Sequence, residues 1–296
     1  MLRPLATDPA ARGLLDDSAH LPGGASGTLI VTTDTIVEGV HFLSSDPAGD
    51  VAGKLLAVNL SDLAAKGATP IGALLNYPLT DDAWDAAFVA GLGIALAELG
   101  CPLIGGDTVA LPQGAPRVLT LTALGTSPAA PVRSGAQAGD ALYVLGAIGD
   151  AGAGLAIARG EPGPAALLAA YRRPRPLLAE GQALAPHVTA MMDVSDGLLI
   201  DAERMASASG LAVTIDLAAI PLSPELIAHS GDSRATRLSA ATAGDDYALL
   251  FAAPTETTLP IPAIRIGGFG PGSGLTLHDG GRPLPLPDRL GFQHGV

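Results

Sequence analysis

The alternation of two kinds of apolar segment most strongly constrains the fold of this chain. Short runs rich in β-branched residues, such as Thr28 to Thr33 and Val118 to Leu124, alternate with longer alanine- and leucine-rich runs, such as Val51 to Lys66. The first kind is typical of strands and the second of helices. The order therefore indicates an α/β or α+β fold and argues against a repeat protein or a coiled coil.

Further segments follow the same two patterns. The predicted strands are residues 28–33, 71–77, 118–124, 141–145, 189–192, 212–215 and 247–251. The predicted helices are residues 51–66, 82–99, 151–158, 177–184 and 198–209. The C-terminal fifth of the chain contains PTETTLPIP and GGFGPGSG, so we expect turns and short strands there.

One segment is the best candidate for a domain boundary. Residues 126–140 are rich in Pro, Gly, Ser and Ala and separate two strand-like runs, which is typical of a linker. We therefore predict an N-terminal domain over residues 1–134 and a C-terminal domain over residues 135–296. A second, shorter break is expected at Gly160 to Pro164.

Composition excludes several classes of protein. A chain of 296 residues with 48% hydrophobic content can bury a sizeable core. The net charge of -13 and the lack of a basic stripe argue against nucleic acid as a partner. The single cysteine, Cys101, excludes an intrachain disulfide and suits a reducing cytoplasm. No signal peptide is expected, and the longest apolar run, Val89 to Leu99, is too short to cross a membrane.

The placement of the aspartates is the most informative chemical signal. Several of them directly follow or interrupt strongly apolar runs, namely Asp34, Asp62, Asp107, Asp193 and Asp196. A carboxylate in such a place needs a compensating partner. Few basic residues lie nearby in sequence, and a hard divalent cation such as Mg²⁺ prefers oxygen ligands. The pattern therefore favours a magnesium site.

Each motif also has an ordinary structural interpretation. Ser195 to Leu198 reads as a helix N-cap, Gly105 to Thr108 as a turn after a strand, and Asp16 with Asp17 as a solvated acidic pair. Asp62 is harder to explain by solvation, since it lies in a very apolar helix. His41 could be a hydrogen-bonded loop histidine. Only the set as a whole indicates a function.

Common nucleotide-binding signatures are missing. The sequence has no G-x-x-x-x-G-K-[ST] loop and no protein-kinase signature set. The run from Gly146 to Gly154 does not have the G-x-G-x-x-G spacing, although a helix N-terminus there could approach phosphate. A Walker-type NTPase and a nicotinamide enzyme are therefore both disfavoured.

In their order and spacing, several motifs together resemble those of the thiamine-monophosphate kinase family. That family belongs to the superfamily of aminoimidazole ribonucleotide synthetase and selenophosphate synthetase. The matching runs span nearly the whole chain: LLDDSA, TTDTIVEGVHF, AVNLSDLAAKGATP, LIGGDT, VRSGAQAGDALYVLGAIGDAGAGLA, RRPRP, MMDVSDGLLIDAERMASASG, AGDDYALLF and LGFQHG.

The resemblance implies a two-domain fold, in which strands of an N-terminal α+β half form a β-barrel with those of a second subunit. The C-terminal half would be an α/β, sandwich-like domain. The resemblance also implies a cytoplasmic homodimer that binds ATP and several Mg²⁺ ions, with K⁺ as a further candidate cation. No nucleic-acid or membrane partner is implied.

The resemblance also assigns site residues. The metal positions would be Asp17, Thr32, Thr33, Asp34, Asp62, Asp107, Asp193 and Asp196. Gly106, Asp107, Arg133 and Ser195 would contact the nucleotide, with Asp196 and Arg133 as the catalytic pair. His41, Asp245 and Phe292 would contact the thiamine substrate. Asp245 stands where the family motif has glutamate, and Gly13 to Asp17 departs from the usual glycine-rich lead-in.

The implied reaction is transfer of the γ-phosphoryl group of ATP to thiamine monophosphate, directly and in line, with several Mg²⁺ ions assisting. Three alternatives stay open. One is another ATP-using enzyme of the superfamily with a different acceptor. The second is a non-catalytic protein that binds nucleotide or thiamine phosphate, and the third is an acidic structural protein.

Overall fold

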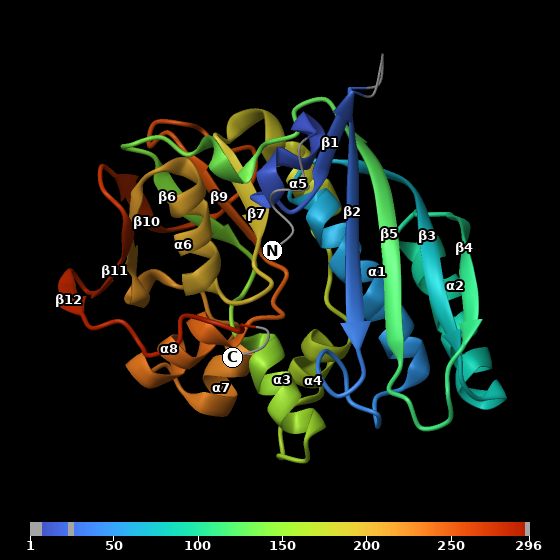
Figure 1. Ribbon diagram of the computed structural model, residues 1–296. Coiled ribbons are helices and arrows are strands. Elements are labelled where there is room, and N and C mark those ends of the chain that lie inside the picture. The colour runs from blue at the N-terminus through green and yellow to red at the C-terminus, as the bar shows by residue number, and fades with distance from the viewer. Residues whose placement is uncertain (1–7, 23–26, 294–296) are drawn as a thin grey trace.

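The computed structural model describes residues 8–22 and 27–293, which form two β-sheets with helices packed around them (Figure 1). The start of the chain, where the sequence predicts no signal peptide, lies outside the described residues, as does the end of the LGFQHG run. The molecule is a mixed α/β protein, which confirms the predicted fold class at this level.

The N-terminal half contains a five-stranded sheet in the order β1-β2-β5-β3-β4. Its strands are β1 (Ala19–Pro22), β2 (Thr28–Val37), β3 (Thr69–Leu79), β4 (Leu103–Ala110) and β5 (Val118–Ser127). Strands β3 and β4 are parallel, and the other neighbours are antiparallel. Helix α1 (Ala48–Ala64) packs against β2 and β5, and α2 (Asp82–Glu98) packs against α1.

Helix α1 lies at the centre of the molecule, between the two sheets (Figure 1). It contacts the N-terminal sheet on one side and α5 and β7 of the C-terminal half on the other. Because nearly every residue of the helix is apolar or small, it can be buried on all sides. Its few polar side chains, among them Lys54, Asn59 and Asp62, are therefore buried too.

The C-terminal half contains a seven-stranded sheet in the order β12-β11-β8-β10-β6-β9-β7. Its strands are β6 (Ala141–Leu145), β7 (Ala190–Asp193), β8 (Ala212–Asp216), β9 (Leu249–Ala253), β10 (Ile264–Gly270), β11 (Gly274–Asp279) and β12 (Arg282–Leu284). Its α-helices are α3 (Asp150–Ala158), α4 (Ala165–Arg172), α5 (Leu178–Leu184), α6 (Leu198–Ser209), α7 (Pro224–Ser230) and α8 (Arg234–Ala243). Short 3₁₀ helices complete the described chain: η2 (Pro9–Leu14), η4 (Arg133–Gly135), η5 (Ala185–His187) and η6 (Leu217–Ala219).

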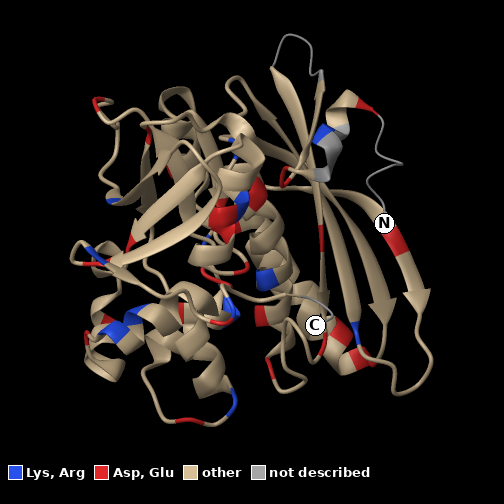
Figure 2. Ribbon diagram, turned by 60° about the vertical axis from the view of Figure 1, so that its left-hand side comes forward, with Lys and Arg blue, Asp and Glu red and all other residues tan. Residues whose placement is uncertain are grey.

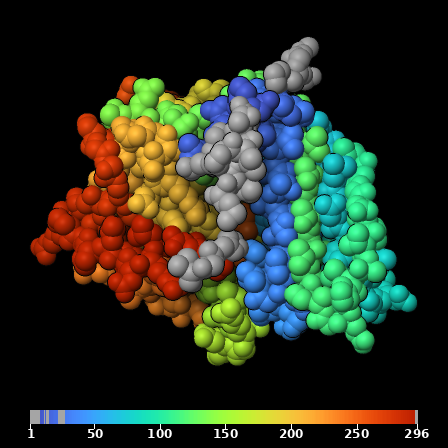
Figure 3. Space-filling view, viewed as in Figure 1, coloured from blue at the N-terminus to red at the C-terminus, as the bar shows by residue number. Residues whose placement is uncertain are grey.

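The hydrophobic core has one cluster in each half and a smaller third cluster between them. The third cluster joins the end of α1, at Ala64 and Ala65, to Met191 of β7 and Phe251 of β9. The space-filling view shows the N-terminal strands on one side of the molecule and most of the C-terminal half on the other (Figure 3). Apolar contacts therefore fix the two halves against each other.

All the predicted strands and helices are present, with small shifts at their ends. Two expectations about aspartates are wrong. Strand β2 continues to Val37, so Asp34 lies inside it and not at its end. Gly105 to Thr108 forms part of β4 and not a turn, because it pairs with β3. Close packing requires glycine there, since a Cβ at Gly106 would lie 1.9 Å from the Leu75 carbonyl oxygen.

Strand β4 forms an exposed edge of the N-terminal sheet, although it carries apolar side chains. Ile104 is 57% exposed and Val109 is 51% exposed.

Acidic positions occur in both halves of the molecule (Figure 2). Among the described residues, no helix has the length and apolar character needed to cross a membrane.

Candidate active site

A cavity of about 490 Å³ lies between the two halves and brings together many of the predicted site residues. Strand β2 and helix α1 form one wall, and the loops after β7 and α8 form much of the other. The predicted residues that line it are Asp34, His41, Asp62, Asp193, Ser195, Asp196, Asp245 and Phe292. Side chains far apart in sequence therefore share one solvent-filled space.

Three carboxylates form an acidic cluster, two of which, Asp62 and Asp193, line the cavity. One oxygen each of Asp17, Asp62 and Asp193 lies within 4.8 Å of the other two. Asp62 comes from α1 and Asp193 from the end of β7, and both are buried. The Thr32 hydroxyl of β2 lies within hydrogen-bond distance of two oxygens, Asp62 Oδ2 and, at 3.1 Å, the backbone carbonyl of Asp17.

Burial and mutual repulsion make ionisation of these carboxylates costly. Burial, together with the charge of Asp196, raises the pKa of Asp34 to about 6. Burial raises the pKa of Asp193 to about 7, and the nearby charges of Asp201 and Asp34 add to the effect. The pKa of Asp62 is raised well above its usual value by burial and by the charges of Asp34 and Asp193. A cation would relieve this strain.

The donor set fits a hard divalent cation. Asp62 and Asp193 offer carboxylate oxygens at short mutual distance, and the neighbouring Asp34 shares their electrostatic environment. Mg²⁺ binds such oxygens together with water. Carboxylates that line a cavity and have strongly perturbed pKa values are candidates for a functional site.

The interpretation of Asp16 and Asp17 as a solvated pair is wrong. Their side chains are only 3% and 6% exposed, and Lys66 Nζ lies 2.6 Å from Asp16 Oδ1 and 3.0 Å from Asp17 Oδ2. Arg133 binds the other oxygen of Asp17. The argument that basic partners are scarce therefore fails for Asp17, because these two partners are distant in sequence and become neighbours only in the fold.

Asp201 organises the loop that carries Ser195 and Asp196, and sequence analysis missed it. Its Oδ2 accepts hydrogen bonds of 3.0 to 3.2 Å from the backbone N–H groups of Ser195, Asp196 and Gly197. Arg204 pairs with Asp201 and also with Asp196, at 2.9 and 2.5 Å. The available signal was the spacing of Asp201 from the Asp-Gly step, which is typical of a carboxylate that caps a turn.

The three predicted substrate residues line the outer part of the cavity. His41 Nδ1 accepts a hydrogen bond from the Val37 N–H. Asp245 has a left-handed backbone with φ of 64°, and its carboxylate accepts from Lys54 Nζ at 2.6 Å and from the Tyr247 hydroxyl at 3.0 Å. The Phe292 N–H donates to the Asp196 carbonyl. Sequence analysis missed the contribution of Lys54 and Tyr247.

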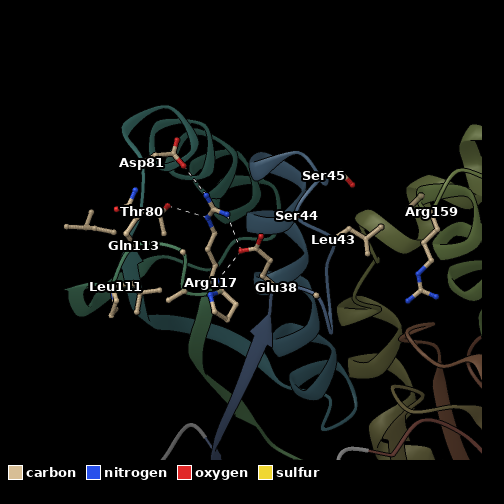
Figure 4. Close-up of a pocket in the computed structure, with 17 residues that line it drawn as sticks. Glu38, Leu43, Ser44, Ser45, Thr80, Asp81, Leu111, Gln113, Arg117 and Arg159 are labelled. Carbon is tan, nitrogen blue, oxygen red and sulfur yellow. Dashed lines mark hydrogen bonds and ion pairs between the residues drawn. The ribbon is translucent and has the colours of Figure 1, made fainter.

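A second and larger cavity, of about 850 Å³, has none of the three acidic-cluster residues in its lining (Figure 4). Its most prominent cation, Arg117, is bound by Glu38 at 3.1 Å and by Asp81 at 2.9 Å, and its guanidinium lies over the Trp84 ring. Arg117 is thus held by the protein itself. The smaller cavity, which holds Asp34, Asp62 and Asp193 with their raised pKa values, is therefore the better candidate for the active site.

Three predicted residues lie elsewhere on the N-terminal sheet. The Thr33 side chain bonds to the Leu121 carbonyl and the Thr122 hydroxyl on β5. Gly106 and Asp107 belong to the edge strand β4, which β5 and β3 separate from β2. Asp107 is in register with Thr35 of β2 across those strands. Three inter-strand spacings, about 14 Å in total, separate the backbones of these two residues. Within one chain, Asp107 does not reach the cluster.

Comparisons with known proteins match both halves of the chain. The model of the family "AIR synthase related protein, N-terminal domain" matches residues 15–127, and that of "AIR synthase related protein, C-terminal domain" matches residues 137–258. Thiamine-monophosphate kinase of Caulobacter vibrioides is 40% identical, covering 100% of this chain and 89% of the relative. The Escherichia coli enzyme of the same name is also 40% identical, covering 95% and 91%.

Solved structures agree with these relatives. AaThiL complexed with AMPPCP and TMP superimposes with a TM-score of 0.82 at 29% identity, covering 96% of this chain and 97% of that one. Thiamine-monophosphate kinase from Stenotrophomonas maltophilia gives a TM-score of 0.78 at 34% identity, covering 95% and 94%. The hydrogenase maturation protein HypE in complex with ATP, at 21% identity and a TM-score of 0.71, shares the fold.

Proposed function

This chain belongs to the thiamine-monophosphate kinase family of AIR synthase related proteins, and we propose that it transfers the γ-phosphoryl group of ATP to thiamine monophosphate. The products are thiamine diphosphate and ADP. The observation that carries the proposal is the cavity between the halves, in which buried carboxylates adjoin His41, Asp245 and Phe292. Its volume of about 490 Å³ is in the range of small-molecule sites.

The acidic cluster is proposed as the magnesium site. Asp34, Asp62 and Asp193 would be the principal ligands, because their raised pKa values show the electrostatic cost of an unpaired cluster. Asp17 and Asp196 have basic partners, which an ion would have to displace. Thr32 would contribute its hydroxyl, whereas the Thr33 side chain is directed to the other face of the sheet. Bound Mg²⁺ would neutralise the negative charge of ATP and of the acceptor phosphate and hold their oxygens in line, and K⁺ is proposed as a further cation.

The proposed transfer is direct and forms no phospho-enzyme. The phosphate of thiamine monophosphate is already an anionic nucleophile at neutral pH, so no strong general base is needed. The protein must therefore position two anions and limit their repulsion. Arg133 would bind the nucleotide phosphates, and Ser195 and Asp196 would lie beside them on the loop that Asp201 holds.

The outer part of the cavity is proposed to bind the thiamine part of the acceptor. Phe292 offers an aromatic ring that is 43% exposed, and His41 lines the same cavity. Asp245 is one methylene shorter than the glutamate of the family motif. Lys54 and Tyr247 fix its carboxylate, so it can still present a defined negative edge to a cationic ring.

A homodimer is proposed because the site of a single chain lacks two of its predicted members. Gly106 and Asp107 lie on the exposed edge strand β4. Pairing of two N-terminal sheets into a barrel would cover this edge and bring Asp107 of the partner subunit toward the nucleotide. We assign the barrel to residues 1–134 and the second domain to residues 135–296.

The decisive experiment supplies the purified protein with ATP, Mg²⁺ and thiamine monophosphate and detects thiamine diphosphate by mass spectrometry. We expect product with Mg²⁺ and none with EDTA. No product with or without K⁺ would refute the proposal. Recovery of labelled protein after incubation with γ-labelled ATP alone would contradict direct transfer.

A further inference from the structure

Lys66 is a fully buried cation beside the acidic cluster. Its side chain is 0% exposed, and Nζ contacts Asp16 Oδ1 at 2.6 Å, Asp17 Oδ2 at 3.0 Å and the Met191 carbonyl oxygen at 3.1 Å. An ammonium group has three N–H donors, so these contacts use all of them. Burial of an ion costs several kcal/mol unless such partners compensate it. Lys66 is therefore held in one place by the fold.

These contacts leave Asp17 with little capacity for a metal ion. Lys66 occupies one of its oxygens, and Arg133 Nη2 occupies the other. Asp16 is also saturated, because it accepts hydrogen bonds from the Asp17 and Arg133 N–H groups and pairs with Arg12 at 3.3 Å. The two carboxylates are thus neutralised by basic side chains of the same chain.

The charge of Lys66 also reaches the rest of the cluster. Burial raises the pKa of Asp62 and of Asp193, and the Lys66 charge acts in the opposite direction on both. One oxygen of Asp17 lies within 4.8 Å of oxygens from these two residues. The Lys66 ammonium group therefore lies where its positive charge stabilises the ionised forms of Asp17, Asp62 and Asp193.

We propose that Lys66 is a built-in cation that takes the place of one divalent ion at Asp17. Lys66 then stabilises the metal-free cluster and reduces the affinity for a divalent ion at Asp17, which leaves Asp34, Asp62 and Asp193 as the operative ligands. The inference rests on the metal site of the proposed function. It concerns binding of the ion alone and so can be tested without ATP or thiamine monophosphate.

The test measures thermal unfolding of the full chain in EDTA and at increasing MgCl₂, because an ion that binds only the folded state raises the unfolding midpoint. In Lys66→Met, we expect a lower midpoint in EDTA. We also expect the half-maximal rise at an Mg²⁺ concentration at least about tenfold lower than in the parent protein, since a repelling charge is gone and Asp17 becomes available.

Lys54→Met is the matched control. Lys54 is also a buried lysine with a carboxylate partner, but that partner is Asp245 and not a member of the acidic cluster. We expect this variant to be less stable at every Mg²⁺ concentration, with the half-maximal rise at the parental value. An unchanged Mg²⁺ response in Lys66→Met would show that Lys66 is only structural and would overturn the proposal.

Asp16→Asn supplies a second test that does not alter Lys66. The amide can still accept a hydrogen bond, but one of the two negative charges that Lys66 neutralises is lost. The excess positive charge should weaken Mg²⁺ binding, so the half-maximal rise should move to a higher concentration. If Lys66→Met does not fold, this variant decides the matter, and a parental Mg²⁺ response would overturn the proposal. Absence of thiamine diphosphate alongside the expected shifts would refute only the proposed kinase activity.

Discussion

Among single residues, substitution of Asp62 should raise the stability of the metal-free protein and lower its catalytic activity. Its pKa is raised by burial and by the charges of Asp34 and Asp193, so its ionised form destabilises the metal-free protein. Asp62→Asn keeps an acceptor for the Thr32 hydroxyl and removes one repelling charge. We expect a higher unfolding midpoint in EDTA and a loss of thiamine diphosphate formation of more than about 100-fold. Calorimetry should also detect weaker binding of Mg·ATP.

Asp140→Asn is a suitable control for this prediction. Asp140 is buried like Asp62, but it accepts hydrogen bonds from the Gln137 N–H and the Thr189 hydroxyl outside the cavity. This variant should lose stability and keep its Mg²⁺ dependence and product formation. Equal losses of activity in the two variants would mean that Asp62 has no special role.

The sequence predicts which aspartates belong to the site better than it predicts which basic side chains pair with them. Aspartates that interrupt apolar runs are visible without a structure, and Asp34, Asp62 and Asp193 indeed lie together. Lys66 and Arg133 are far in sequence from the rest of the cluster, and only tertiary packing brings them to Asp17. The same reason explains why Lys54 could not be assigned to Asp245 in advance.

Among the elements, the loop between β7 and α6 depends on one side chain, that of Asp201. Asp201 Oδ2 accepts three backbone hydrogen bonds in this loop, and burial raises the pKa of Asp201 to about 6 although the charge of Arg204 acts in the opposite direction. Asp201→Ala leaves three donors and Arg204 without this partner, so the free energy of unfolding should fall by about 2–4 kcal/mol. Urea denaturation measures this loss.

The loop also carries Ser195 and Asp196, so Asp201→Ala should raise the KM for ATP through loss of positioning. Asp232→Ala, which removes an exposed carboxylate paired with Arg237, serves as the control and should unfold close to the parental midpoint. A KM for ATP that stays at the parental value in Asp201→Ala would contradict the positioning role.

Element boundaries were predictable where a strong pattern existed. Helix α6 begins and ends at the predicted residues because an Asp-Gly step precedes its apolar face and a glycine follows it. Strand β4 was not predictable, since its glycine pair is more typical of a turn and only the parallel pairing with β3 explains it. Short helices α7 and α8 were missed despite their capping residues Ser223 and Ser233.

For the whole molecule, the stability gained from Mg²⁺ should depend on pH. The pKa values of Asp34 and Asp193 are about 6 and about 7, whereas both are near 3.8 in the unfolded chain. Between pH 4 and 7 the folded state therefore holds protons that the unfolded state has released. These two groups alone make the metal-free protein less stable as pH rises through this window.

Metal binding requires the ionised carboxylates, so the rise in unfolding midpoint caused by Mg²⁺ should be small at pH 5 and large at pH 8. Taking the difference between Mg²⁺ and EDTA at each pH removes the opposite contribution of His20, whose pKa burial lowers to about 4. Differential scanning calorimetry at both pH values measures this difference. A rise that is equal at pH 5 and pH 8 would argue against metal ions at these carboxylates.

The proposed homodimer makes a prediction that no single chain can satisfy. If each site takes Asp34 from one chain and Asp107 from the partner subunit, Asp34→Asn and Asp107→Asn homodimers are both inactive.

When the two variants are co-expressed, each mixed dimer has one site with both substitutions and one intact site. Random pairing makes half of the dimers mixed, so about a quarter of parental activity should return. Sequential affinity purification on two different tags, one on each variant, isolates the mixed form, which should have about half the parental rate. Continued inactivity of that isolated form would place Asp34 and Asp107 in the same site of one chain, although three strand spacings, roughly 14 Å, separate β2 from β4.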